Sequence, residues 1–166
     1  MRKDVLGFSL IELLIVVAVI LTIAAIAIPN LMRSRIAANQ ASAVGSLHVL
    51  NTAEATYSST YGGYSPTLGY LGPPDPGSNP VPSAAGLIDN ILSGGSPGAT
   101  ESSKSGYTFT YSPGVTQAGK IYSYTILAAP NEVGKTGYNF YYTDQVGVIR
   151  ENTTTEAGST DSPLAG

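Results

Sequence analysis

The residues that carry most enzyme chemistry are sparse in this sequence and do not gather. The chain has 166 residues, with no cysteine and a single histidine, His48. The lack of cysteine excludes thiol nucleophiles, thiolate metal sites and disulfides. A Ser-His-Asp set would have to use His48, and no nucleophile-elbow motif accompanies it. We therefore expect a solvated or interfacial histidine, no catalytic residue and no enzyme activity.

Sites for metals, cofactors and nucleic acids are also missing from the sequence. Four aspartates are far apart and form no D-x-[DN]-x-[DN] loop, so a calcium site has little support. No phosphate-binding glycine motif of the Walker or G-x-G-x-x-G kind occurs. A formal net charge of -3 and a pI of about 4.9 argue against a general nucleic-acid binder. We expect no metal, no cofactor and no specific nucleic-acid or small-molecule partner. These four aspartates, which all follow the apolar run, are Asp75, Asp89, Asp144 and Asp161.

One carboxylate does stand in a chemically unusual place. The stretch from Phe8 to Pro29 reads FSLIELLIVVAVILTIAAIAIP, and Glu12 is its only charged residue. A helix needs about 20 apolar residues to cross a hydrocarbon core. A charge inside such a span costs about 2.5–3.5 kcal/mol on insertion scales and is usually kept for a partner. Arg2 and Lys3 precede the run and favour a cytoplasmic N-terminus.

Two ordinary interpretations explain this run only in part. A cleaved secretory signal has an apolar core of about 7–15 residues and a small-residue cleavage site. The run here is longer and ends in Ile28-Pro29-Asn30. A simple membrane anchor accounts for the length but gives no reason for Glu12.

The string Gly7-Phe8-Ser9-Leu10-Ile11-Glu12 resembles the cleavage site of prepilins, the precursors of type IV pilins and of type II secretion pseudopilins. The resemblance implies that a membrane peptidase cuts after Gly7 and N-methylates Phe8, and that Glu12 becomes an assembly contact. Pro29 also matches the family pattern, in which subunits often lose helical order just before this proline on assembly. The implied organisation is a leader at residues 1–7, a transmembrane and polymerisation stem at 8–29, and an extracytoplasmic head at 30–166.

The resemblance also implies a function and partners. The chain would be a structural subunit of a type IV pilus-like filament, a homopolymer held together by its N-terminal helices. In the filament, Glu12 of one subunit would meet the Phe8 amine of its neighbour. Further partners would be the prepilin peptidase and methylase and the pilus or secretion assembly platform. The chain would sit in the inner membrane before assembly and in a cell-surface filament, or a periplasmic pseudopilus, afterwards.

Two alternatives stay open at this point. Within the family, the chain would be a pseudopilin of a type II secretion system. In a different class, it would be a single-pass membrane-anchored binding domain that never polymerises. Isolating filaments and asking whether this chain forms their bulk separates these functions.

The spacing of apolar residues along the chain predicts the helices and strands that position these residues. Residues 8 to about 60 predict one long helix, with a kink or local loosening at Pro29, which lacks an N–H group. Beyond Pro29 the pattern becomes amphipathic and predicts a face that packs on the protein's own sheet. The members of that face are Ile36, Ala43, Leu47, Leu50, Ala53 and Tyr57.

The rest of the chain predicts a small antiparallel sheet. Helix followed by a meander of about four strands gives an α+β architecture, which also matches the pilin plan. Before the strands we expect a loop, then a short helix at 83–92 and a flexible segment at 93–106. The expected strands are 107–111 and 121–128, followed by a hairpin of 138–143 with 147–150, and then a loose tail at 151–166.

Overall fold

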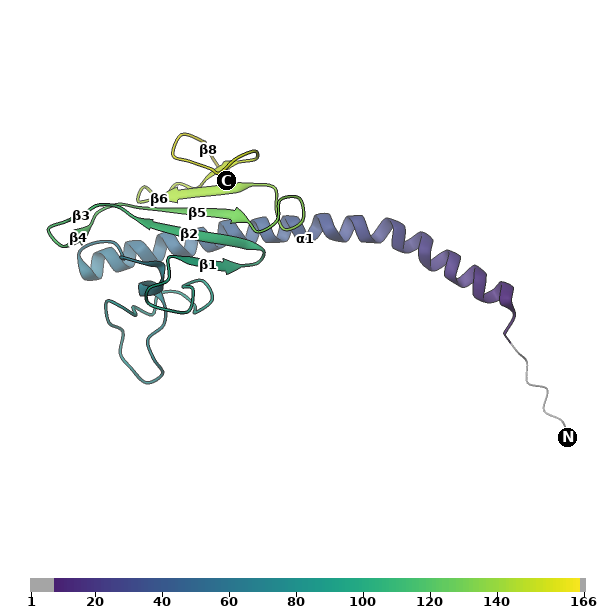
Figure 1. Ribbon diagram of the computed structural model, residues 1–166, viewed down its shortest axis with the longest axis horizontal. Coiled ribbons are helices and arrows are strands. Elements are labelled where there is room, and N and C mark those ends of the chain that lie inside the picture. Colours follow the sequence, from purple (N-terminus) through teal and green to yellow (C-terminus); the bar gives the residue numbers. More distant parts are fainter. Residues whose placement is uncertain (1–7, 165–166) are drawn as a thin grey trace. The chain divides into compact units, whose positions relative to one another are not determined.

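A computed structural model describes residues 8–164 of the chain, which divides into two compact units after Arg35. One helix, α1 (Leu10–Tyr61), belongs to both units (Figure 1). The predicted long helix is confirmed to within about two residues at each end. It is unbroken at Pro29, so the loosening expected there is not seen in the single chain. The predicted leader, including Gly7, lies outside the described residues.

The second unit is an α+β domain, as predicted. Its main sheet is fully antiparallel with strand order β1-β2-β5-β6-β7-β8, and a separate two-stranded ribbon pairs β3 with β4 (Figure 1). The prediction of about four strands was therefore too low. The elements after α1 are η1 (Leu68–Leu71), β1 (Glu101–Lys104), β2 (Tyr107–Pro113), β3 (Thr116–Gln117), β4 (Lys120–Ile121), β5 (Tyr124–Pro130), β6 (Phe140–Asp144), β7 (Arg150–Asn152) and β8 (Ser162–Pro163).

The core lies between the amphipathic half of α1 and one face of this sheet. All six residues of the predicted helix face are buried. On β2, Tyr107, Phe109 and Tyr111 alternate inward, as the sequence pattern predicts, and each is at most 2% exposed. β2 pairs with β5 along its whole length, from Tyr107↔Pro130 to Pro113↔Tyr124. Burial of these aromatic side chains, together with the aliphatic residues of the core, stabilises a domain that has no disulfide.

The segment between α1 and β1 differs from the prediction. No helix forms at 83–92, where the chain makes turns instead, and the short helix is the 3-10 turn η1 in the stretch expected to be loop. The amides of residues 85–88 donate to the carbonyls of Tyr70, Leu71 and Gly72 and not within a helix of their own. Asp89 Oδ1 accepts the backbone N–H groups of Ile91 and Leu92, at 2.9 and 2.8 Å, which caps a single turn at residues 89–93. Leu92 is still buried, so the apolar pattern was right about this buried position but wrong about the helix.

Two further corrections concern the sheet. The predicted flexible segment at 93–106 contains β1, which pairs with β2 from Glu101↔Thr110 to Lys104↔Tyr107. The predicted strand at 121–128 is interrupted at residues 122–123, because Ile121 pairs with Thr116 in the β3–β4 ribbon. Its tight turn has Ala118 and Gly119 at positive φ.

The C-terminal region is also better ordered than predicted. The hairpin of β6 with β7 is confirmed, in the register Tyr142↔Arg150, although β7 begins three residues later than expected. The tail from residue 151 is not loose, because β8 pairs with β7 through Arg150↔Pro163 and Glu151↔Ser162. The Leu164 amide continues this pairing by donating to the carbonyl of Ile149 at 2.8 Å.

Candidate functional site

The first unit presents an apolar helix surface with nothing packed on it among the described residues. The most apolar window of α1 has a mean hydropathy of 3.0, and none of that window is buried. Phe8, at 80% exposed, and Leu10, at 81%, open the run, and Met32 ends it at 50%. Leaving so much apolar area in water is unfavourable, so this surface requires a bilayer or other apolar helices around it.

Glu12 caps the N-terminus of this helix. Its Oε2 accepts the backbone N–H of Ser9 at 3.0 Å, while the Ser9 carbonyl accepts the first helical N–H groups, from Glu12 and Leu13. Ser9 and Glu12 thus have the spacing of a capping box, in which the third helical residue reaches back to the cap. The spacing S-x-x-E could have revealed this in the sequence. Within residues 8–164, Oε1 of Glu12 has no hydrogen-bond partner.

The polar groups inside the apolar run are mostly satisfied by the helix itself. Thr22 Oγ1 donates to the carbonyl of Ala18 at 2.8 Å, which removes the cost of its hydroxyl in a lipid environment. Pro29 has no N–H to donate, so the carbonyl of Ala25 loses its usual helical partner. Within the stem, this is the one backbone carbonyl whose helical donor is missing because the donor residue is a proline.

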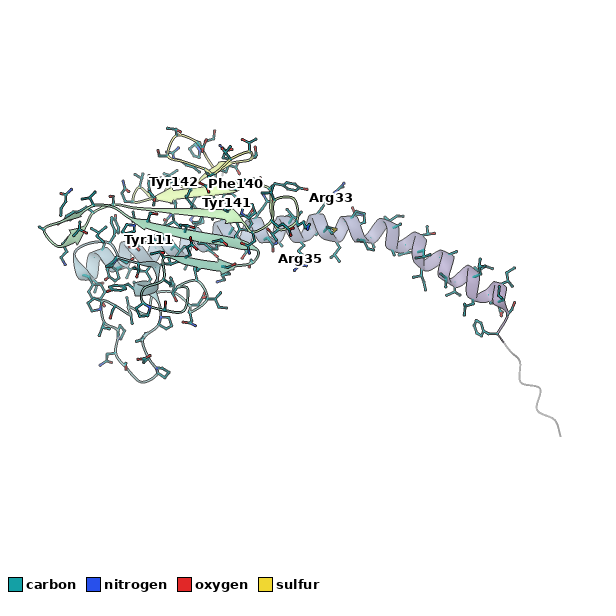
Figure 2. All side chains as sticks on the ribbon, viewed as in Figure 1. Arg33, Arg35, Tyr111, Phe140, Tyr141 and Tyr142 are labelled. Carbon is teal, nitrogen blue, oxygen red and sulfur yellow. The ribbon has the colours of Figure 1, made fainter. Side chains whose placement is uncertain are left out.

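Two arginines follow the apolar run. Arg33 and Arg35 are exposed, and neither forms an ion pair with a carboxylate of residues 8–164. Figure 2 shows both on α1. Two positions along a helix correspond to a rotation of about 200°, so the two side chains leave the helix on nearly opposite sides. They therefore offer positive charge around the helix rather than on one face.

The other residues considered for chemistry have structural roles. His48 is exposed on α1, as expected. Asp89 pairs with Lys104 at 2.9 Å, and hydrogen bonds from the Leu92 amide and from Lys104 lower the pKa of its carboxyl. Asp144 accepts the Val146 amide in the turn after β6. No group of three or more potential metal ligands occurs among residues 8–164.

A buried carboxyl group that the sequence analysis missed lies deeper in the head. Glu54 is fully buried on α1, one step from the predicted apolar face. Its Oε2 accepts the Ser65 amide at 3.0 Å, and its Oε1 lies 2.5 Å from Ser65 Oγ. Tyr111, labelled on β2 in Figure 2, donates its hydroxyl to the Ser65 carbonyl at 2.7 Å. Desolvation by burial raises the pKa of Glu54 above its usual range, against the opposing hydrogen bonds from Ser65.

The C-terminal strand is held by a polar clasp around Asp161. Its carboxylate accepts the Gly158 amide at 2.7 Å and Asn152 Nδ2 at 3.1 Å. Its backbone carbonyl accepts Arg150 Nη1 at 2.8 Å. Asn152 Oδ1 in turn accepts the Thr154 amide at 2.9 Å. The Asn152 side chain therefore contacts both Asp161 and the backbone of the segment that follows β7.

Comparison with known proteins identifies the N-terminal part of the chain. Residues 2–28 match the family model described as the prokaryotic N-terminal methylation motif. This motif is the signature of type IV prepilins and pseudopilins, so the resemblance found in the sequence is confirmed over residues 2–28, and it indicates a prepilin-type substrate of prepilin peptidase. No curated protein and no solved structure matches the chain.

Proposed function

We propose that this chain, which carries the prepilin signature at residues 2–28, is a structural subunit of a type IV pilus-like filament. The observation that carries the proposal is the capped apolar helix with a single carboxylate at its N-terminal end. A single copy of such a helix is stable in a bilayer. Many identical copies are stable when they pack against one another in a bundle. The α+β head stays in water in both states.

Before assembly the stem spans the inner membrane. From Leu13 to Met32 an α-helix rises about 30 Å, which matches the thickness of the hydrocarbon core. This places Glu12 at the cytoplasmic edge and Arg33 with Arg35 among the headgroups of the outer leaflet. Arginines on opposite sides of a helix are suited to that position, because lipid phosphates surround the helix in every direction.

Cutting after Gly7 creates a new amine at Phe8, four residues before Glu12 in the chain. Glu12 Oε2 already binds the Ser9 amide of its own chain, and no group of residues 8–164 donates to Oε1. We assign this donor role to the methylated Phe8 amine of a neighbouring subunit. Pairing both charges as the stems leave the membrane edge avoids two isolated charges in an apolar core. In this proposal Pro29 is the point at which the stem can unwind as the helices pack.

The processing step is tested by the intact mass of the chain isolated from cells that contain a prepilin peptidase. We expect a chain that begins at Phe8 and carries one methyl group. Gly7→Val should leave the precursor uncut. A mature chain that begins at Met1, or one cut after Ile28, would rule out this processing and leave a signal or an anchor as the function of the run.

The assembly contact needs an experiment that separates charge from capping, because Glu12 serves both. Glu12→Gln keeps an oxygen acceptor for the Ser9 amide but removes the charge. Glu12→Ala removes both, and Ser9→Ala is a control that changes the neighbouring side chain but leaves the carboxylate and its bond to the amide of position 9 in place. We expect sheared filament yield to collapse in both Glu12 variants, with membrane-bound protein unchanged. Normal filaments from Glu12→Gln would show that the residue only caps the helix.

The same filaments decide between the candidate functions. A fibre whose bulk is this chain supports the pilus-type subunit, and a short fibre seen only with a secretion system present supports the pseudopilin. Membrane-anchored chain with no fibre under either condition would overturn polymerisation and favour an anchored binding domain.

A further inference from the structure

We propose that Glu54 carries a proton in the folded head at neutral pH, and that losing this proton loosens the segment after α1. The head then contains a proton-dependent clamp between α1, residues 62–71 and β2. The inference is independent of whether the chain polymerises, because every residue in the clamp belongs to the second unit.

The first step is the position of Ser65. Its side chain is fully buried, and all its polar groups are engaged. The amide donates to Glu54 Oε2, the carbonyl accepts from the Tyr111 hydroxyl, and Oγ contacts both Glu54 Oε1 and the carbonyl of Thr67. One buried serine therefore ties a helix, a loop and a central strand together.

The second step is a count of protons. Ser65 Oγ has one proton and two close neighbouring oxygens, Glu54 Oε1 at 2.5 Å and the Thr67 carbonyl at 2.9 Å, and the Tyr111 hydroxyl lies farther away at 3.3 Å. A carbonyl can only accept, and the Tyr111 proton is already used at 2.7 Å on the Ser65 carbonyl. If Glu54 is neutral, it donates to Ser65 Oγ, which donates to Thr67, and every contact has its proton. If Glu54 is ionised, the single Ser65 Oγ proton serves only one of these two close contacts. In the other contact, two oxygen atoms face each other with no proton between them.

The third step is the surroundings of the carboxyl group. The ionisable groups that act on it are all phenols, Tyr57 on α1, Tyr111 on β2 and Tyr124 on β5. The charged groups near these tyrosines bind elsewhere. Lys120 donates to the Tyr61 carbonyl at 2.5 Å, and Asp144 accepts from Tyr142 and Val146. No lysine, arginine or histidine of residues 8–164 pairs with Glu54, so no cation offsets the cost of burying its charge.

The direction of the pH effect follows from which state holds the proton more tightly. Burial raises the pKa of Glu54 in the folded chain above that of the unfolded chain. The folded state then binds more protons between the two pKa values, so stability is fully present below the unfolded pKa and falls as pH rises through the folded one. One proton changes the unfolding equilibrium constant by at most about tenfold for each pH unit in that window.

The loosened segment is defined by its contacts. Residues 62–71 lead from the end of α1 into η1, where Leu68 and Leu71 are fully buried. Ionised Glu54 would still accept the Ser65 amide but would draw the Ser65 hydroxyl away from Thr67. Ser65 then moves outward so that water can solvate the charge on Glu54. This movement exposes both ends of the 62–71 segment to water.

The test uses the full chain in detergent micelles between pH 5 and pH 9. Glu54→Gln reproduces the neutral pattern, because its amide donates to Ser65 Oγ and its oxygen accepts the Ser65 N–H. Glu101→Gln changes an exposed carboxylate on β1 and is the matched control. We expect the wild-type melting temperature to fall with rising pH, in parallel with Glu101→Gln, and that of Glu54→Gln to stay flat. Amide exchange at residues 62–71, compared with Glu54→Gln at each pH, should rise in the same window.

A direct measurement keeps the proposal testable if Glu54→Gln does not fold. In wild-type chain labelled with ¹³C at glutamate carboxyl groups, one resonance should remain in its protonated position at pH 7. Parallel pH profiles for wild type and Glu54→Gln would overturn the clamp. So would a spectrum in which every glutamate titrates in the usual range.

Discussion

Replacing Asp161 should release the C-terminal strand while leaving the core folded. The side chain of Asp161 accepts two hydrogen bonds, from the Gly158 amide and from Asn152 Nδ2. A hydrogen bond to a charged group contributes roughly 1.5–3 kcal/mol. Because Asp161 is half-exposed and water can replace these partners, we expect about 2 kcal/mol for the pair in Asp161→Ala. If β8 opens locally, this is about a 30-fold faster exchange of its protected amide.

The assay is amide exchange of Leu164, whose N–H is bound to the Ile149 carbonyl only when β8 is in place. Glu156→Ala is the control, since this exposed carboxylate in the same loop makes no hydrogen bond among residues 8–164. Asp161→Asn keeps an acceptor and should show an intermediate rate. Leu164 exchange in Asp161→Ala within twofold of the control would refute the clasp. The strand would then be held by its β7 pairing alone.

Three further predictions concern the head. Leu47→Ala removes a fully buried side chain and should lower the free energy of unfolding by about 2–5 kcal/mol, measured by denaturant titration. Gly137→Ala should lower the melting temperature, because a Cβ there overlaps the Tyr107 phenol and breaks its 2.9 Å bond to the Asn139 carbonyl, whereas Gly158→Ala, with nothing near its Cβ, should not. Residues 30–166 alone should give a soluble monomer with mixed helix and strand and a cooperative melt, and an insoluble product would contradict a self-contained head.

The features that sequence reasoning predicted are those set by local pattern. The α1 helix and its buried face follow from apolar spacing, because a helix satisfies its own backbone and repeats its side chains every few residues. The alternation of Tyr107, Phe109 and Tyr111 fixes the inward face of β2 in the same way. The Gly7 to Glu12 string gave the prepilin signature, which the family match at residues 2–28 confirms.

The features that it missed depend on partners far along the chain. β1 has the sequence Glu-Ser-Ser-Lys, with no apolar pattern, and is a strand because β2 offers a free edge to pair with. The short strand β8 lies where Arg150 and Asn152 both donate hydrogen bonds to Asp161 across the loop. Residues 83–92 make turns because the amides of residues 85–88 pair with the carbonyls of residues 70–72, and apolar spacing cannot reveal these contacts. Each of these features depends on backbone or polar contacts and not on a regular spacing of apolar residues.

The two glutamates of α1 show why residue type and neighbours in the sequence do not assign a role. Glu12 stands among apolar residues, yet its carboxylate is at a helix N-terminus, where the free N–H groups stabilise negative charge. Glu54 stands among ordinary helix residues, yet the fold encloses it and a neutral carboxyl completes the hydrogen bonds of Ser65. The same substitution, glutamate to glutamine, should therefore have opposite results. It removes the charge that the proposed assembly contact uses at position 12, and it preserves the neutral donor that the clamp uses at position 54.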